Sequence, residues 1–595
     1  MIQVRKLSYS IPEKELYKKV SFTIADDGHY AFIGSNGTGK STLVSMMLQP
    51  DEYLYEGKIE FSEAYKNSRI GYVSQFSQEE KPEETTVFTF ISEEFVALEN
   101  KIAQLCDKMG TETDLDAVFE EYQAALDEKD AIDGDHYESN IKKQLKLAQL
   151  EKLENQKLSN LSGGEFKLIQ VIKEMMLSPK MLIMDEPDVF LDFDHINALK
   201  DLINAHKGTL LIITHNRYLL NHCFDHILHL EDTDIQEFEG TYLDYNLELL
   251  STKVELQEAV AKDEEEIERQ QNIVNRIRAN ATAMDNASLG RSVHARQTLL
   301  DRLESRKTKA PFVYVNRPEI SFQMEEEVQQ DAEPILSLVD YEVSFDEQLL
   351  EHVNFQMKLG DKVAIVGKNG TGKTTLLREI CDNQKSSIQI SQHTRLAMFS
   401  QVTGELYPAG HTLTEIIMEK SEEKGAESSF HKKSEAVDFL GKYGFVEEDA
   451  GKRFEDLSGG EKDLFQLAVI SLEGANLLLL DEPTGHLDVY AQMALEQAIE
   501  NYKGSVLMVS HDYYSVANSM DYVLLVEDDH LRQMSIRRFR QMIYANHFDK
   551  EYLLLEEKKK ELEMRVEQLL EKKEFGKAKL LLEQLGPIVK KLNVN

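Results

Sequence analysis

The stretch GSNGTGKST at residues 34–42 fits a phosphate-binding loop, and GKNGTGKTT repeats it at 367–375. Each loop follows an apolar, strand-like run and leads into a helical pattern, which is the context that the motif needs. Its glycines let backbone N–H groups turn around phosphates at a helix N-terminus that favours anions. A chance glycine-rich turn would not recur in the same context, so the sequence predicts two P-loop domains of the α/β class.

Side chains of the two loops complete the predicted sites for ATP and Mg²⁺. Lys40 and Lys373 offer positive charge to the terminal phosphates, and the hydroxyls of Ser41 and Thr374 suit Mg²⁺. The other predicted ATP-binding residues are Gly34, Ser35, Asn36, Gly37, Thr38, Gly39 and Thr42 in the first loop and Gly367, Lys368, Asn369, Gly370, Thr371, Gly372 and Thr375 in the second.

Downstream of each loop, a pattern typical of a buried strand ends in Asp-Glu-Pro. Asp185 and Asp481 are placed to hold Mg²⁺, and Glu186 and Glu482 to orient or deprotonate the attacking water. Matching positions in the two halves add four further candidates, which are Gln75 and Gln401 as Mg²⁺ ligands and His215 and His511 as catalytic contacts to the γ-phosphate.

The pentapeptide LSGGE occurs at 161–165 and again at 457–461. By itself it describes a helix N-terminus, with serine as the cap and glutamate in the first turn. Its repetition makes it part of the larger duplication. The candidate residues are Ser162, Gly163, Gly164 and Glu165 in the first copy and Ser458, Gly459, Gly460 and Glu461 in the second.

Length and composition limit the possible classes. A chain of 595 residues suits several domains, and its net charge of −39 opposes indiscriminate coating of nucleic acid. No apolar run approaches the ~20 residues of a membrane span, and the N-terminus has no signal-peptide core. Cys106, Cys223 and Cys381 match no metal or disulfide spacing, which argues against a metal cluster. We therefore expect a cytoplasmic protein with no membrane segment.

The ordered set of motifs closely resembles the ATP-binding-cassette ATPases over nearly the whole chain. The resemblance implies that two cassettes pair head to tail within one monomer. The LSGGE signature of each cassette then caps the ATP held by the phosphate loop of the other. Residues 458–460 are thereby expected over Lys40, and residues 162–164 over Lys373.

Two cassettes in one chain without a membrane segment look like the ABC-F group. The first cassette has 86 residues between Gln75 and Ser162, against 56 between Gln401 and Ser458, and the extra helical stretch at about 88–140 is similar to the arm of that group. The expected order is a first cassette at 1–245, a helical hairpin linker at 246–312, a second cassette at 313–545 and a C-terminal helical extension at 546–595. The extension carries an apolar stripe of helical spacing, formed by Leu562, Val566, Leu569 and Leu570.

The linker carries a focused positive charge. Residues 269–309 contain nine Arg or Lys against three Asp or Glu, and a turn-like stretch at 279–290 separates two helical limbs. Charge and spacing alone fit a solvated coiled coil equally well, whereas the resemblance implies contact with ribosomal RNA and transfer RNA. The candidate RNA contacts are Arg276, Arg278, Arg291 and Arg296.

The first cassette departs from the pattern of the family. It reads EPDVFLD where the second reads EPTGHLD, and Asn216 follows the switch histidine where aspartate is common. We expect the two sites to hydrolyse ATP at different rates for this reason. Phe345 fits the adenine-stacking position of the second cassette, while the first has Ile11 there, with Tyr9 nearby.

The favoured function is that of a ribosome-binding ABC-F ATPase, whose ATP-driven closure acts near the E site and the peptidyl-transferase centre. That mechanism serves either a translation factor or an antibiotic-resistance protein that protects the ribosome. A DNA-associated ATPase and the ATPase subunit of a membrane transporter are the alternatives. The strong negative charge argues against the first, and a transporter subunit would not need the basic linker.

Overall fold

The computed structural model describes the chain except residues 13, 63–64, 66–68, 76–83, 110–114, 190, 285–316, 325–332, 345–347, 401–406, 409, 423–429, 528, 546–549 and 594–595. It divides into two compact units. Unit 1 is formed by Met1–Glu239 and Asn316–Arg540, and unit 2 by Gly240–Val315 and Gln541–Asn595. Both cassettes lie in unit 1.

The first cassette is built on a six-stranded sheet in the order β5-β6-β7-β3-β8-β9, and a three-stranded antiparallel sheet, β2-β1-β4, shares its core. The strands β6 and β7 are buried along their whole length, as expected for parallel strands covered on both faces. The strands are β1 (Ile2–Ile11), β2 (Lys14–Ile24), β3 (His29–Ile33), β4 (Glu56–Phe61), β5 (Ile70–Val73), β6 (Met181–Asp185), β7 (Thr209–Ile213), β8 (His226–Glu231) and β9 (Asp234–Glu239).

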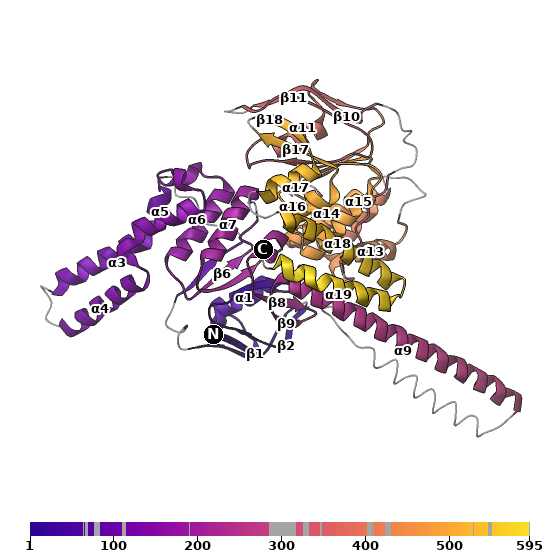
Figure 1. The fold of residues 1–595 in the computed structure, drawn as a ribbon, viewed down its shortest axis with the longest axis horizontal. Coiled ribbons are helices and arrows are strands. Elements are labelled where there is room, and N and C mark those ends of the chain that lie inside the picture. The colour runs from indigo at the N-terminus through magenta and orange to yellow at the C-terminus, as the bar shows by residue number, and fades with distance from the viewer. Residues whose placement is uncertain are drawn as a thin grey trace. The chain divides into compact units, whose positions relative to one another are not determined.

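Helices of the first cassette fall into those around the sheet and those of the arm. In the arm, α3 and α4 lie side by side (Figure 1). They pack through Leu98, Leu105, Val118 and Ala125. The helices are α1 (Lys40–Leu48), α3 (Val87–Met109), α4 (Leu115–Ala131), α5 (Tyr137–Leu147), α6 (Gly163–Met176), α7 (Phe193–Ala205) and α8 (Arg217–His222).

The second cassette repeats this plan, with a six-stranded sheet in the order β14-β15-β16-β12-β17-β18 and a three-stranded sheet β11-β10-β13. The predicted pair of P-loop α/β domains is confirmed. Its strands are β10 (Leu336–Ser344), β11 (Gln348–Met357), β12 (Lys362–Val366), β13 (Ile388–Ile390), β14 (Leu396–Phe399), β15 (Leu477–Asp481), β16 (Ser505–Val509), β17 (Tyr522–Glu527) and β18 (His530–Ser535). Its helices are α11 (Lys373–Asp382), α12 (Leu413–Glu422), α13 (Lys433–Lys442), α14 (Gly459–Leu472), α15 (Val489–Asn501), α16 (Tyr513–Ser519) and α17 (Ile536–Ala545), the last of which continues into unit 2.

Unit 2 contains α9 (Tyr242–Met284), α18 (Lys550–Glu571) and α19 (Phe575–Leu592). Helix α9 has 43 residues, about 65 Å at the usual rise, and continues into the stretch where we expected a turn, because its alanine-rich end favours a helix. The second limb of the predicted hairpin lies outside the described residues.

The C-terminal hairpin of α18 and α19 packs on the base of α9 (Figure 1). The predicted apolar stripe faces this contact, where Val566 and Leu570 bury Val254. Lys253 Nζ donates to Glu567 at 2.7 Å and Lys579 Nζ lies 2.6 Å from Glu258, so ion pairs flank the apolar contact. No described helix combines the length and the apolar character that a bilayer span requires.

Candidate nucleotide-binding sites

Two sites are defined by their phosphate loops: site 1 by the loop of Lys40 and site 2 by the loop of Lys373. Each loop joins a buried central strand to a helix, and the residue before the helix, Gly39 or Gly372, has a positive φ of 102° or 84°. A side chain at Gly39 would also strike the hydroxyl of Tyr17, 2.8 Å from the position of its Cβ. Glycine is therefore required at position 39 both by the backbone conformation and by the lack of space for a side chain.

The loop lysines are buried against their own loops. Lys40 Nζ donates to the carbonyls of Gly34 and Ser35 at 2.9 and 3.0 Å, and Lys373 Nζ donates to Gly367 and Lys368 at 2.9 and 2.5 Å. Burial lowers the pKa of each lysine. These ammonium groups are held at the loop mouth, where they can be offered to a phosphate.

Residues suited to Mg²⁺ lie where the strands β6 and β15 end. Thr374 Oγ1 donates to Asp481 Oδ1 at 3.0 Å, while Asp481 Oδ2 is buried without a hydrogen-bond partner. In site 1 the buried Asp185 Oδ1 also has none, and burial raises the pKa of Asp185, opposed by the Ser41 hydroxyl. Buried carboxylate oxygens beside a hydroxyl fit a hard divalent cation, so these four residues could hold Mg²⁺.

In site 1, the candidate base Glu186 sits at φ 46° directly after β6. Gln75 Nε2 donates to its Oε2 at 2.6 Å. Burial, with Asp185 and Asp188 nearby, raises the pKa of Glu186 to about 7. His215 is also buried, its Nε2 has no hydrogen-bond partner, and burial holds its pKa well below the usual value.

In site 2, Glu482 and His511 are in direct contact. The backbone N–H of His511 donates to Glu482 Oε2 at 3.1 Å, and His511 Nε2 lies 3.3 Å from Glu482 Oε1. Burial raises the pKa of Glu482 to about 8 and lowers that of His511 to about 3, so a neutral pair is favoured. A carboxyl group with a pKa near neutrality is suited to accept a proton from water.

Both signature segments begin helices through the same capping box. Ser162 Oγ accepts from the Glu165 N–H at 3.2 Å, and Glu165 Oε2 accepts from the Ser162 N–H at 2.8 Å. Ser458 and Glu461 repeat this arrangement at 3.4 and 2.8 Å. The interpretation of LSGGE as a helix cap is therefore compatible with its place in a larger motif.

The structure brings each signature to the phosphate loop of the other cassette. A cavity of about 710 Å³ at site 2 is lined by both groups, including Ser162, Gly163, Gly164, Lys373 and Thr374. At site 1 the approach is tighter, since a Cβ built on Gly460 would lie 1.9 Å from Asn36 Nδ2. These are the pairings expected from the sequence, and the roles of the residues stay predictions.

Two aspartates, each six residues after a candidate base, also form hydrogen bonds between the cassettes. The Asn36 N–H donates to Asp488 Oδ2 at 3.0 Å, and the Asn369 N–H donates to Asp192 Oδ2 at 3.2 Å. Asn36 Nδ2 further donates to the carbonyl of His486 at 2.8 Å. The two aspartates were not among the predicted site residues, although their repeated LD dipeptide was a usable signal.

Lys167 is a second residue that the motif patterns missed. Its Nζ donates to the carbonyl of Gln75 at 3.2 Å and to that of Ser74, which ties the signature helix to the glutamine loop of site 1. Burial lowers the pKa of Lys167 to about 8. The equivalent position in the second cassette is the buried Asp463, so no lysine makes this link from that position.

Some predicted residues are not placed. Gln401, Phe345, Arg291 and Arg296 lie outside the described residues. The other two candidate RNA contacts, Arg276 and Arg278, lie on α9. Tyr9, near the first adenine-stacking position, stacks on Tyr17 with ring centroids 6.3 Å apart.

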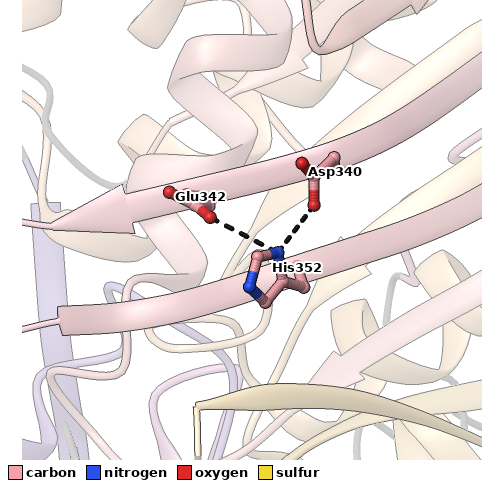
Figure 2. A group of neighbouring side chains, drawn as sticks. All are labelled: Asp340, Glu342 and His352. Carbon is pink, nitrogen blue, oxygen red and sulfur yellow. Dashed lines mark hydrogen bonds and ion pairs between the residues drawn. The ribbon is translucent and has the colours of Figure 1, made fainter.

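An exposed polar group lies away from the nucleotide motifs. His352 on β11 places Nδ1 2.7 Å from Asp340 and 3.5 Å from Glu342, both on β10 (Figure 2). The hydrogen bond to Asp340 raises the pKa of His352. Ion pairing on the sheet surface accounts for this cluster.

Comparisons with known proteins agree with this geometry. The ABC transporter family matches residues 17–189 and 350–485, more than half of the chain, and a further ABC transporter segment matches residues 228–322. The chain therefore belongs to the ABC transporter family of ATP-binding-cassette proteins. Domains of this family generally bind and hydrolyse ATP with Mg²⁺.

Similar proteins define more narrowly which type of ATP-binding-cassette protein this is. The protein is similar to the uncharacterized ABC transporter ATP-binding protein YfmM of Bacillus subtilis, with 29% identity over 530 residues, 86% of this chain and 96% of the relative. It is 28% identical over 528 residues to the energy-dependent translational throttle protein EttA of Haemophilus influenzae, 87% of this chain and 90% of EttA. With its twin cassettes and the intervening segment, the protein is of the ABC-F type.

Solved structures support the fold alone. In a model of ribosome-bound archaeal Pelota and ABCE1, the matching chain aligns with a TM-score of 0.53 at 17% identity, over 91% of this chain and 80% of that one. The RNase-L inhibitor aligns with a TM-score of 0.52 at 18% identity, over 91% of this chain and 92% of that one.

Proposed function

We propose that this protein is an ATP-driven switch that binds the ribosome in the cytoplasm and acts on translation. The observation that carries the proposal is the long helix α9, which follows directly after a cassette in a chain that carries both halves of two ATP sites. The relationship to EttA, named as a translational throttle, supports ribosome binding. The positive charge of residues 269–309 supports contact with RNA.

The cassette interface is the moving part of the proposed switch. Bound MgATP supplies the phosphate charge that draws each loop and the opposite signature together. The helix N-termini at Ser162 and Ser458 are suited to this because their N–H groups and dipoles favour an anion. Closure then creates the ribosome-binding state, and hydrolysis, with Glu186 and Glu482 as bases, ends it.

The test is co-sedimentation of the Glu186→Gln/Glu482→Gln double variant with bacterial ribosomes. This variant retains the phosphate loops, so we expect it to bind ATP, hydrolyse it slowly and remain closed. It should pellet with ribosomes in the presence of ATP and stay in the supernatant without nucleotide. Absence of pelleting, with ATP binding shown separately, would reject the ribosomal function.

A charge-matched pair of variants tests the linker. Neutralising Arg276, Arg278, Arg291 and Arg296 in the double variant should abolish co-sedimentation. The control neutralises Lys6, Lys18, Lys19 and Lys58, four exposed lysines of the β2-β1-β4 sheet, and should leave most of the binding. Equal losses would mean that net charge, not the linker, controls binding.

Repeating the assay with ribosome-directed antibiotics separates a translation factor from a protection protein, because only the latter should displace a drug.

A further inference from the structure

The side chain of Arg217, which follows the switch segment of the first cassette, contacts residues of the second cassette. Arg217 begins α8, two positions after His215. Its Nη2 donates to Glu496 and, at 3.1 Å, to Asp512 Oδ2, both in the second cassette. All three side chains are largely buried, with exposed fractions of 10, 12 and 17%. A buried arginine with two carboxylate partners is a strong, specific contact.

The two carboxylates that accept from Arg217 are held in place by further hydrogen bonds within the second cassette. Asp512 Oδ1 caps α16 by accepting from the Tyr514 N–H at 2.9 Å, and its Oδ2 accepts from Ser515 Oγ at 2.7 Å. Glu496 accepts from Asn518 Nδ2 at 2.9 Å. The guanidinium also lies 5.0 Å from the centre of the Tyr514 ring. These bonds fix both carboxylates, so the position of Arg217 and the position of Asp512 depend on each other.

The contact has no counterpart in the opposite direction. Helices α7 and α15 both have 13 residues and both follow a capping aspartate, so Lys200 occupies the position of Glu496. Asn216 occupies the position of Asp512, and Tyr513 occupies the position of Arg217. A reciprocal clasp would need an arginine and two carboxylates, and the chain has none of the three at those positions.

Asp512 is bonded through the backbone to His511, which contacts the candidate base Glu482. On the other side, Asn216 caps α8 by accepting from the N–H groups of Tyr218 and Leu219 at 3.0 and 3.2 Å, and it joins Arg217 to His215. A continuous path of bonds therefore runs from the switch histidine of site 1 to that of site 2, with one ionic step between cassettes.

We propose that Arg217 is a positioning residue through which the switch segment of the first cassette holds the His511–Glu482 pair of site 2 in its active geometry. The clasp is one-sided, since an arginine reaches from the switch segment of the first cassette to the second and no arginine stands at the equivalent position 513, so we expect its loss to act mainly on hydrolysis at site 2. This role depends on the ATPase activity of the family and goes beyond ribosome binding. The ATPase assay can therefore fail while ribosome binding holds, and the reverse, so the failure of one proposal is distinguishable from the failure of the other.

The experiment measures ATP hydrolysis of full-length Arg217→Met in two backgrounds. In Glu186→Gln, turnover reports site 2, and in Glu482→Gln it reports site 1. We expect Arg217→Met to lower kcat about tenfold in the first background with little change in KM, and to change kcat less than twofold in the second. Equal losses in both backgrounds would show a merely structural contact, and no loss in either would also overturn the proposal.

Three further variants guard against misfolding. Arg217→Lys retains the charge and should recover part of the site 2 rate, while its melting temperature should match that of the parent. Glu496→Gln added to Arg217→Met should cost little more than Arg217→Met alone, because both remove the same contact. Lys200→Met, at the pseudo-equivalent position, should leave both rates unchanged. Additive losses, or an equal loss in Lys200→Met, would contradict a one-sided clasp.

Discussion

In site 2 the candidate base Glu482 touches the switch histidine His511, whereas in site 1 the equivalent Glu186 accepts from Gln75. Nearby, site 1 has the half-buried Asp188 and site 2 has the buried Thr484 at the same position. Thus the two sites share strands, loops and caps but surround the reacting position with different charges. Duplicated folds keep the backbone that positions a ligand, while the polar residues around it are free to diverge.

The largest expected difference comes from removing one base at a time. Glu482→Gln should lower total ATP turnover by about 100-fold or more, because site 2 already holds its base against a histidine. Glu186→Gln should lower it only several-fold, and this loss should come through the coupling of site 1 to site 2, because site 1 itself then supplies little of the turnover. Steady-state phosphate release at saturating ATP measures both. Indistinguishable rates for the two variants would remove the proposed inequality of the sites.

The pH dependence of kcat/KM should separate the sites by about one unit. Burial raises the pKa of Glu482 to about 8 and that of Glu186 to about 7. A base acts only when deprotonated, so activity rises with pH through each value. The rising limb should lie near pH 8 in Glu186→Gln and near pH 7 in Glu482→Gln. Coincident limbs would mean that the two bases share one environment.

Lys167→Met should affect site 1 alone. The lysine holds the carbonyl of Gln75, whose amide donates to Glu186 at 2.6 Å. Without it, we expect about a fivefold lower rate in the Glu482→Gln background and no change in the Glu186→Gln background. Lys173→Met is the matched control, since this lysine is on the same helix but pairs with Glu93. An equal effect of the two substitutions would assign the loss to helix packing.

The smallest effect is expected from exchanging the acid near Glu186. Asp188 is one of the charges that raise the pKa of Glu186, so Asp188→Thr should move the rising limb of site 1 to lower pH by about half a unit. Thr484→Asp should move the limb of site 2 in the opposite direction. Measuring both profiles in the single-base backgrounds tests the sign. A shift of site 1 to higher pH would contradict the electrostatic explanation.

Much of the site was predictable because its parts are local. The loops at 34–42 and 367–375 and the two LSGGE segments each define a backbone conformation within a few residues, through glycine at positive φ or a serine cap. The positions of the acids at the ends of β6 and β15 were predictable because each buried strand stops at the corresponding edge of its own sheet. Repetition made each assignment stronger than its motif alone.

The sequence by itself determined two cassettes, their motifs and the departure at Asp188. Only the tertiary structure decided that Arg217 reaches Asp512, that Lys167 holds the Gln75 loop and that the C-terminal stripe packs on α9. The physical reason is that local motifs are specified by neighbouring dihedral angles. Contacts between residues 92 to 314 positions apart depend instead on how whole buried surfaces fit together, and no single short pattern encodes that fit.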